Sequence, residues 1–212
     1  MDSADFGIVL VDPNTELCDE FELHFKRFDN VTVVCDRFES LPNFDCMVSA
    51  ANSFGLMDGG VDAAITSFFG LELMDRVQAH IISEFRGEQP VGTSFVIETG
   101  NDAHPFLAHT PTMRVPMAIS ATDHVYKAMW SMLLAVWNHN KTSNRRIKTV
   151  ACPGLGTATG RVPPRSAANQ MSLAYSNFLY PPDQISWPFA MDRQKAIGRG
   201  GDEGFRKLAA GF

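Results

Sequence analysis

Short apolar runs alternate with amphipathic segments along nearly the whole chain. The apolar runs predict buried strands at 6–11, 31–35, 45–51, 94–98, 106–110 and 147–151. The segments whose apolar residues recur at helical spacing predict helices around 17–28, 61–69, 71–85, 121–139 and 167–178. This alternation predicts an α/β fold, a three-layer α/β/α sandwich with a mixed, largely parallel central sheet. Ligands of such sheets bind at the carboxyl ends of strands.

Residues with capping side chains precede two of the predicted helices. Asp12 is followed by Pro13, which suits an N-cap with proline in the first turn. Ser120 and Thr122 are the candidate caps of the helix predicted at 121–139.

The composition changes after Tyr180. Pro181-Pro182 is followed by an apolar stretch around Trp187 and then by the glycine-rich segment 198–201. We therefore expect one domain over residues 1–180 and a C-terminal tail over 181–212 that packs partly and frays at its end.

The overall negative charge of the chain disfavours polyanions such as nucleic acids as partners. The chain of 212 residues has 18 Lys plus Arg against 24 Asp plus Glu, a net charge of −6, which works against general nucleic-acid binding. No stretch approaches the roughly 20 apolar residues that cross a bilayer, and the start lacks the pattern of a signal peptide. We expect a cytoplasmic protein with no membrane partner.

Four cysteines, Cys18, Cys35, Cys46 and Cys152, are spread along the chain. Three of them lie in apolar runs that predict strands, and we expect all four to be reduced thiols in the core. No two are spaced closely enough to share a zinc ion, so we expect no metal and no cofactor.

Two glycine-rich segments follow predicted strands and precede helices, at 52–62 and at 153–163. Glycines allow close backbone approach, and the free N–H groups of a helix start favour an anion such as a diphosphate. An ordinary strand-to-helix turn is the alternative for the first segment. The second has neither the Gly-x-Gly-x-x-Gly spacing of a dinucleotide fold nor the Gly-Lys-Ser/Thr ending of a triphosphate loop.

The first segment resembles the first ligand loop of the macro-domain family, an Asn-Ala-Ala-Asn stretch followed by a glycine cluster and Val-Asp. Ser49 replaces the first asparagine, and Met57 and Asp58 stand where glycines are usual. The matching positions are Ala50, Ala51, Asn52, Gly59, Gly60, Val61 and Asp62. Asp58 adds a negative charge that is expected to lower the affinity for a diphosphate.

The second segment is similar to the family's Pro-x-Leu-Gly-Thr-Gly-like loop. Ala158 and Arg161 replace expected glycines, and Gly160 stands near the place of the aromatic residue that covers the distal ribose. The resemblance spans residues 30–180 and also includes His109-Thr110-Pro111, where we expect a structural histidine.

The resemblance implies ADP-ribose, or an ADP-ribosylated macromolecule, as the ligand. Asp36 matches the acidic residue that accepts a hydrogen bond from the adenine amino group, although an aspartate there also suits a helix cap or a solvated charge. The implied ligand-binding residues are Asp36, Arg37, Ala51, Asn52, Gly59, Gly60, Val61, Gly154, Gly156, Thr157, Ala158, Thr159, Gly160 and Arg161.

The resemblance also implies catalytic roles for Asn52 and Asp62, as the pair that orients the distal ribose and activates water in de-ADP-ribosylating members. An amide fixes a sugar hydroxyl and a carboxylate polarises water. The alternative is that Asp62 only stabilises a helix N-terminus.

Several functions therefore remain open. The chain is expected to be an ADP-ribosyl hydrolase or an ADP-ribose 1''-phosphate phosphatase, with a non-catalytic reader or an interaction module as alternatives. A hydrolase with Cys152 or a serine as nucleophile is disfavoured, because no Gly-x-Ser-x-Gly elbow occurs. The sequence does not determine the oligomeric state.

Overall fold

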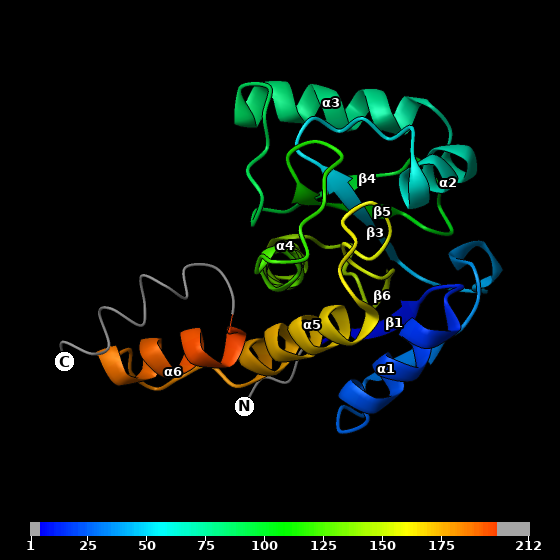
Figure 1. Cartoon of the computed structure of the whole chain (residues 1–212). Coiled ribbons are helices and arrows are strands. Elements are labelled where there is room, and N and C mark those ends of the chain that lie inside the picture. The colour runs from blue at the N-terminus through cyan, green and yellow to red at the C-terminus, as the bar shows by residue number, and fades with distance from the viewer. Residues whose placement is uncertain (1–4, 199–212) are drawn as a thin grey trace.

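A six-stranded sheet forms the centre of the molecule in the computed structural model, which describes residues 5–198 (Figure 1). The strands are β1 (Gly7–Val11), β2 (Val31–Val34), β3 (Cys46–Asn52), β4 (Phe95–Glu98), β5 (Phe106–Met113) and β6 (Thr149–Cys152). Their order is β2-β1-β6-β3-β5-β4, and only β4 runs antiparallel to its neighbour. The mixed, largely parallel sheet is confirmed.

Helices cover both faces of this sheet. They are α1 (Thr15–Phe25), α2 (Gly60–Phe69), α3 (Glu72–Phe85), α4 (His124–Thr142), α5 (Pro164–Leu179) and α6 (Trp187–Ile197). The helices α2 and α3 lie on one side in Figure 1, whereas α1, α4 and α5 lie on the other. Each side has its own apolar cluster, which confirms the three-layer sandwich.

Successive side chains of a strand point to opposite faces of the sheet, so neighbouring residues pack in different clusters. On β3, Cys46 and Val48 pack in the cluster under α1, α4 and α5, whereas Met47 packs in the cluster under α2 and α3. Ser49 follows Val48 and therefore faces the α2 side. This alternation brings the Ser49 hydroxyl to the first turn of α2.

The predicted N-cap positions were wrong, although the Thr122 hydroxyl accepts a hydrogen bond of 3.3 Å from His124 N at the start of α4. The N-cap of α1 is Asn14, whose side chain accepts from Leu17 N, while Asp12 accepts hydrogen bonds from Asn14 N and Gly154 N. Helix α4 begins at His124 and not at residue 121.

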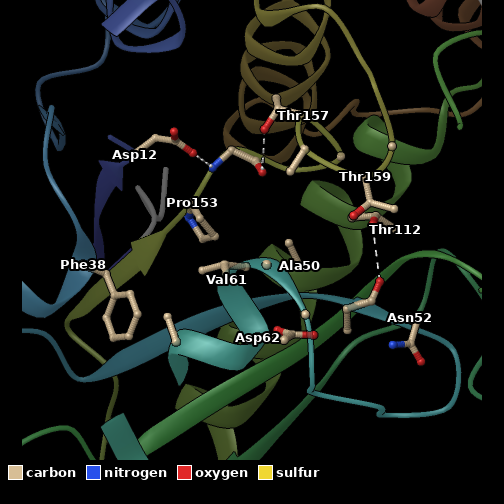
Figure 2. Close-up of a pocket in the computed structure, with 18 of the residues that line it drawn as sticks. Asp12, Phe38, Ala50, Asn52, Val61, Asp62, Thr112, Pro153, Thr157 and Thr159 are labelled. Carbon is tan, nitrogen blue, oxygen red and sulfur yellow. Dashed lines mark hydrogen bonds between the residues drawn. The ribbon is translucent and has the colours of Figure 1, made fainter. Parts of the chain in front are cut away.

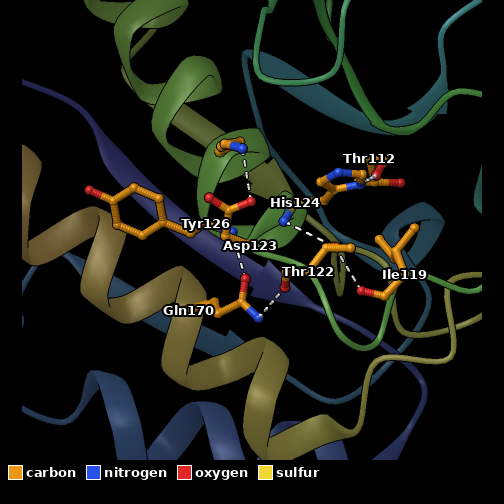
Figure 3. Close-up of polar contacts among 8 residues, drawn as sticks. Thr112, Ile119, Thr122, Asp123, His124, Tyr126 and Gln170 are labelled. Atoms are coloured by element: carbon orange, nitrogen blue, oxygen red, sulfur yellow. Dashed lines mark hydrogen bonds and ion pairs between the residues drawn. The ribbon is translucent and has the colours of Figure 1, made fainter. Parts of the chain in front are cut away.

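The start of α4 is held from another helix. Its N-cap residue, Asp123, makes no capping hydrogen bond and instead pairs with Lys127 at 2.9 Å. The Gln170 amide, from α5, accepts from Tyr126 N at 3.0 Å and donates to the Thr122 carbonyl at 3.3 Å (Figure 3). The contacts of Gln170 could not be predicted from the residues near 121, because Gln170 lies on a different helix.

The C-terminal segment contains a helix. Ser186 caps α6, and Ile197 packs against the main core while Ile185 and Trp187 are exposed. The end of the predicted tail, which is expected to fray, lies outside the described residues. No helix within residues 5–198 is long and apolar enough to cross a membrane.

Three of the four cysteines are buried, namely Cys18, Cys46 and Cys152. The prediction was wrong for Cys35, which is exposed. It lies directly after β2, which ends at Val34 and forms one edge of the sheet, so no neighbouring strand covers it.

Candidate functional site

A cavity of about 520 Å³ opens where β1, β3, β5 and β6 end at their carboxyl sides (Figure 2). A volume of this size suits a ligand of nucleotide dimensions. The predicted residues that line it are Arg37, Ala51, Asn52, Gly59, Gly60, Val61, Asp62, Gly154, Gly156, Thr157, Ala158, Thr159 and Gly160. The fold thus brings both glycine-rich loops to one site.

Asp36 and Arg161 do not line this cavity. The Asp36 side chain is exposed, and its Oδ1 accepts from Arg37 N at 2.7 Å. Arg161 has a φ of 53° and donates its N–H to the Ala158 carbonyl. It therefore adopts the left-handed conformation that favours glycine, the residue that the resemblance leads us to expect there.

The Asn52 side chain holds the first loop together. Its Nδ2 donates to the Leu56 carbonyl at 2.8 Å, and its Oδ1 accepts from Phe54 N at 3.0 Å and Leu56 N at 3.3 Å. Asn52 and Asp62 both line the cavity, but no hydrogen bond joins their side chains within the part of the chain that the structure describes.

Asp62 lies in the first turn of α2 and is 5% exposed. Its Oδ1 accepts a hydrogen bond of 2.6 Å from the Ser49 hydroxyl. Burial raises the pKa of Asp62 from 3.8 to about 7, the Ser49 hydrogen bond opposes that rise, and the charge of Asp58 adds to it. A carboxylate that titrates near neutral pH suits acid–base work better than it suits helix stabilisation.

The start of α2 offers backbone donors to a ligand. The helix begins at Gly60, which has a φ of +56°, and Gly59 before it makes no side-chain cap. The first N–H groups of a helix have no partner within the helix and carry its positive dipole end. This end of α2 favours a phosphate group.

Close packing requires glycine in the second loop. A Cβ on Gly154 would lie 2.3 Å from Leu17 Cδ2 and 2.9 Å from Asp12 Oδ2. A Cβ on Gly160 would lie 2.4 Å from the Gly156 carbonyl oxygen. The loop is therefore held close to β1 and folded tightly on itself.

Part of the cavity lining consists of residues that the sequence did not predict. The missed residues that contribute polar or aromatic side chains are Asp12, Asn14, Phe38, Glu39 and Thr112. Asp12 and Asn14 could have been predicted, because they follow the first predicted strand and the carboxyl ends of parallel strands lie at one edge of the sheet.

Carboxylates outnumber cations around the cavity. Asp12, Glu39, Asp58 and Asp62 line it, whereas Arg37 is the one lysine or arginine among the described lining residues. A bound diphosphate would therefore depend on backbone N–H groups rather than on basic side chains.

Two residues that could suggest other chemistry are structural. Burial raises the pKa of Cys152 far above its usual range, so the reactive thiolate is disfavoured. His109 is also unsuited to catalysis. Its Nδ1 lies 2.6 Å from Gln89 Oε1, and burial lowers its pKa to about 3. No group of three metal-binding side chains occurs among residues 5–198.

Comparison with known families agrees with this geometry. The family model described as the macro domain matches residues 48–171, which include both loops of the cavity. The chain belongs to the macro domain family. An uncharacterised protein of Aquifex aeolicus (strain VF5) is 33% identical over 127 residues, which is 60% of this chain and 70% of that protein.

Solved macro domains share the fold. The macrodomain of Mycobacterium tuberculosis DarG has 21% identity and a TM-score of 0.54, over 66% of this chain and 91% of its own. A mutant of the Oceanobacillus iheyensis macrodomain with ADPR has 20% identity and a TM-score of 0.57, over 76% and 88% of the two chains. The described chain therefore has the architecture of a macro domain.

Proposed function

We propose that this macro domain binds ADP-ribose and hydrolyses ADP-ribose linkages. The position of the Asp62 carboxylate carries the proposal, because Asp62 lines the cavity where the first glycine-rich loop enters α2, and the second loop lines the same cavity. The Oceanobacillus iheyensis macrodomain with ADPR supports the choice of ligand.

The diphosphate would bind the backbone N–H groups around Gly59-Gly60 and Gly156-Thr157. That placement brings the distal ribose toward Asn52 and Asp62, at the end of the cavity formed by β3 and α2. Ionised Asp62 would take a proton from water as the water attacks the anomeric carbon of that ribose. The bond from this carbon to the linked atom of the modified group breaks at the same time, and the leaving group departs with the bonding electrons and takes up the proton from Asp62 or from solvent.

Release of labelled ADP-ribose from modified proteins tests the proposal. Asp62→Ala is expected to lower turnover by a factor of about 10²–10⁴, while most affinity for ADP-ribose remains. Asn52→Ala is expected to raise the Michaelis constant and lower turnover together, because the amide organises the loop that contacts the ribose. Substrates linked through acidic, serine and arginine side chains, DNA-linked substrates and ADP-ribose 1''-phosphate cover the possible bonds.

A non-catalytic reader is the second candidate. The Asn52 amide favours it, because all three of its hydrogen bonds go to loop backbone rather than into the cavity. Wild type that binds ADP-ribose but releases none from any substrate is a reader. Failure of millimolar ADP-ribose to raise the melting temperature would make the chain an interaction module.

A further inference from the structure

Ser49 is fully buried and donates one short hydrogen bond. It lies on β3, on the side that faces α2, and its hydroxyl is 2.6 Å from Asp62 Oδ1. Hydrogen bonds to carboxylates in this distance range are among the stronger ones in proteins.

We propose that Ser49 is a positioning residue, which holds one oxygen of the Asp62 carboxylate so that the other oxygen faces the cavity. This inference rests on the proposed hydrolase function, in which Asp62 activates water. A central strand is a rigid support, since β3 pairs with β5 on one side and with β6 on the other.

No other described residue performs this task. The Thr66 hydroxyl contacts Asp62 only through the main-chain carbonyl, at 2.9 Å. The Asn52 amide is engaged by the loop. Ser49 is thus the one side chain within residues 5–198 that hydrogen-bonds the Asp62 carboxylate.

The surrounding charges give Ser49 a second effect. Asp58, on the loop before α2, disfavours ionisation of Asp62. His109 pairs with Ser49 in register on β5, but its low pKa keeps it neutral near pH 7. No cation among the described residues contributes to the pKa of Asp62, so the Ser49 hydroxyl is the side chain that favours the ionised form, together with the positive dipole end of α2.

A purely structural role of the Ser49 hydroxyl would have a different effect on Asp62. A buried serine needs a partner, and Asp62 could be no more than that partner. In that case, removal of the hydroxyl would lower stability without changing the ionisation of Asp62 in the folded protein.

Carboxyl-carbon NMR titration of Asp62 distinguishes the two readings. The variants are Ser49→Ala, which removes the hydroxyl, Ser49→Thr, which keeps it, and Ser49→Cys, which keeps the shape but donates weakly. Thr66→Val is the matched control, because it removes a buried hydroxyl that contacts only the Asp62 backbone and that of Met57.

Ser49→Ala and Ser49→Cys are expected to raise the Asp62 midpoint by about one pH unit, from about 7, which lowers the ionised fraction at pH 7 about fivefold. Turnover at pH 7 should fall about fivefold and the acid limb of the pH–rate profile should move upward. Ser49→Thr should titrate like wild type. Affinity for ADP-ribose should change less than about twofold, because the diphosphate contacts backbone.

An unmoved midpoint in both Ser49→Ala and Ser49→Cys would overturn the inference, as would an equal shift in Thr66→Val. The titration needs no substrate, so the two proposals can fail separately. Wild type without hydrolase activity ends the proposed function even if the midpoint moves. Active wild type with an unmoved midpoint ends only the role of Ser49.

Discussion

Asp12 and Gly154 are 142 residues apart in the chain, yet Asp12 Oδ2 accepts a hydrogen bond of 3.1 Å from Gly154 N. This contact joins the turn after β1 to the start of the second glycine-rich loop. Both residues line the cavity, so the contact fixes the relative position of two of its walls.

Asp12→Ala is therefore expected to weaken ADP-ribose binding about tenfold. Loss of a charge-assisted hydrogen bond costs about 1.5–3 kcal/mol, and part of this cost lowers the stability of the loop rather than the affinity for the ligand. Asp12→Asn keeps an acceptor oxygen and removes one of the four carboxylates that line the cavity, so it should bind at least as tightly as wild type. Calorimetric titration of both variants measures the difference, and equal affinities for Asp12→Ala and wild type would contradict it.

Glycine at position 160 is expected to be essential for the second loop. Gly160→Ala would place a Cβ 2.4 Å from the Gly156 carbonyl oxygen, whereas a Cβ on Gly59 meets nothing within 4 Å. Gly160→Ala should lower the melting temperature by several degrees, since overpacking typically costs about 1–3 kcal/mol. Gly59→Ala serves as the control, and it should lower the melting temperature much less.

The raised pKa of Asp62 predicts how stability depends on pH. The folded protein binds the Asp62 proton more tightly than the unfolded chain does, so stability falls as the pH rises from about 4 to about 7. Asp62→Asn should raise the free energy of unfolding by about 2 kcal/mol or more at pH 8 and leave it unchanged near pH 4. Urea unfolding at both pH values checks this, and equal gains at the two would show that ionisation is not the cause.

Salt is expected to strengthen ligand binding. Four carboxylates and one guanidinium line the cavity among the described residues, so a dianionic diphosphate meets net repulsion. The Debye length is about 10 Å at 0.1 M salt and becomes shorter at higher salt, so added salt screens this repulsion. The dissociation constant of ADP-ribose should therefore fall about twofold between 0.05 and 0.5 M potassium chloride. A rise over the same range would mean that Arg37 dominates the field.

Asp36→Ala stays a test of adenine recognition. If Asp36 accepts a hydrogen bond from the adenine amino group, its loss should weaken ADP-ribose by about 1.5–3 kcal/mol and ribose 5-phosphate much less. Competition titrations with both ligands measure the two losses. Equal losses would assign Asp36 to loop structure, a role consistent with its exposed side chain and its contact to Arg37 N.

Regular local patterns predicted the fold well, and distant contacts explain the errors. The alternation of apolar runs and amphipathic segments predicted all six strands and the order of helices α1 to α5. The predicted end of β5 at Thr110 was three residues early, because Pro111 lacks an N–H group and normally interrupts pairing. The strand continues to Met113 with a register shift opposite Ala51 and Asn52.

The glycine loops of the site were visible in the sequence, whereas its polar connections were not. Gly60 and Gly156 have φ values of +56° and +71°, which is a local requirement for glycine, whereas Gly154 is required by its close contacts with Leu17 and Asp12. The Ser49 contact to Asp62 depends on how a strand faces a helix, so it required the packed layers.

The position of β6 in the sheet has a consequence for synthesis on the ribosome. It lies between β1 and β3, although it is the last strand to emerge. Until residue 152 has left the exit tunnel, the native pairings available are limited to β2-β1 and β3-β5-β4, so the edges of β1 and β3 that pair with β6 in the folded protein lack their partner. Nascent chains at this stage should be prone to aggregation and should need chaperone protection, because sheet closure must wait for the most distant pairing in the sequence.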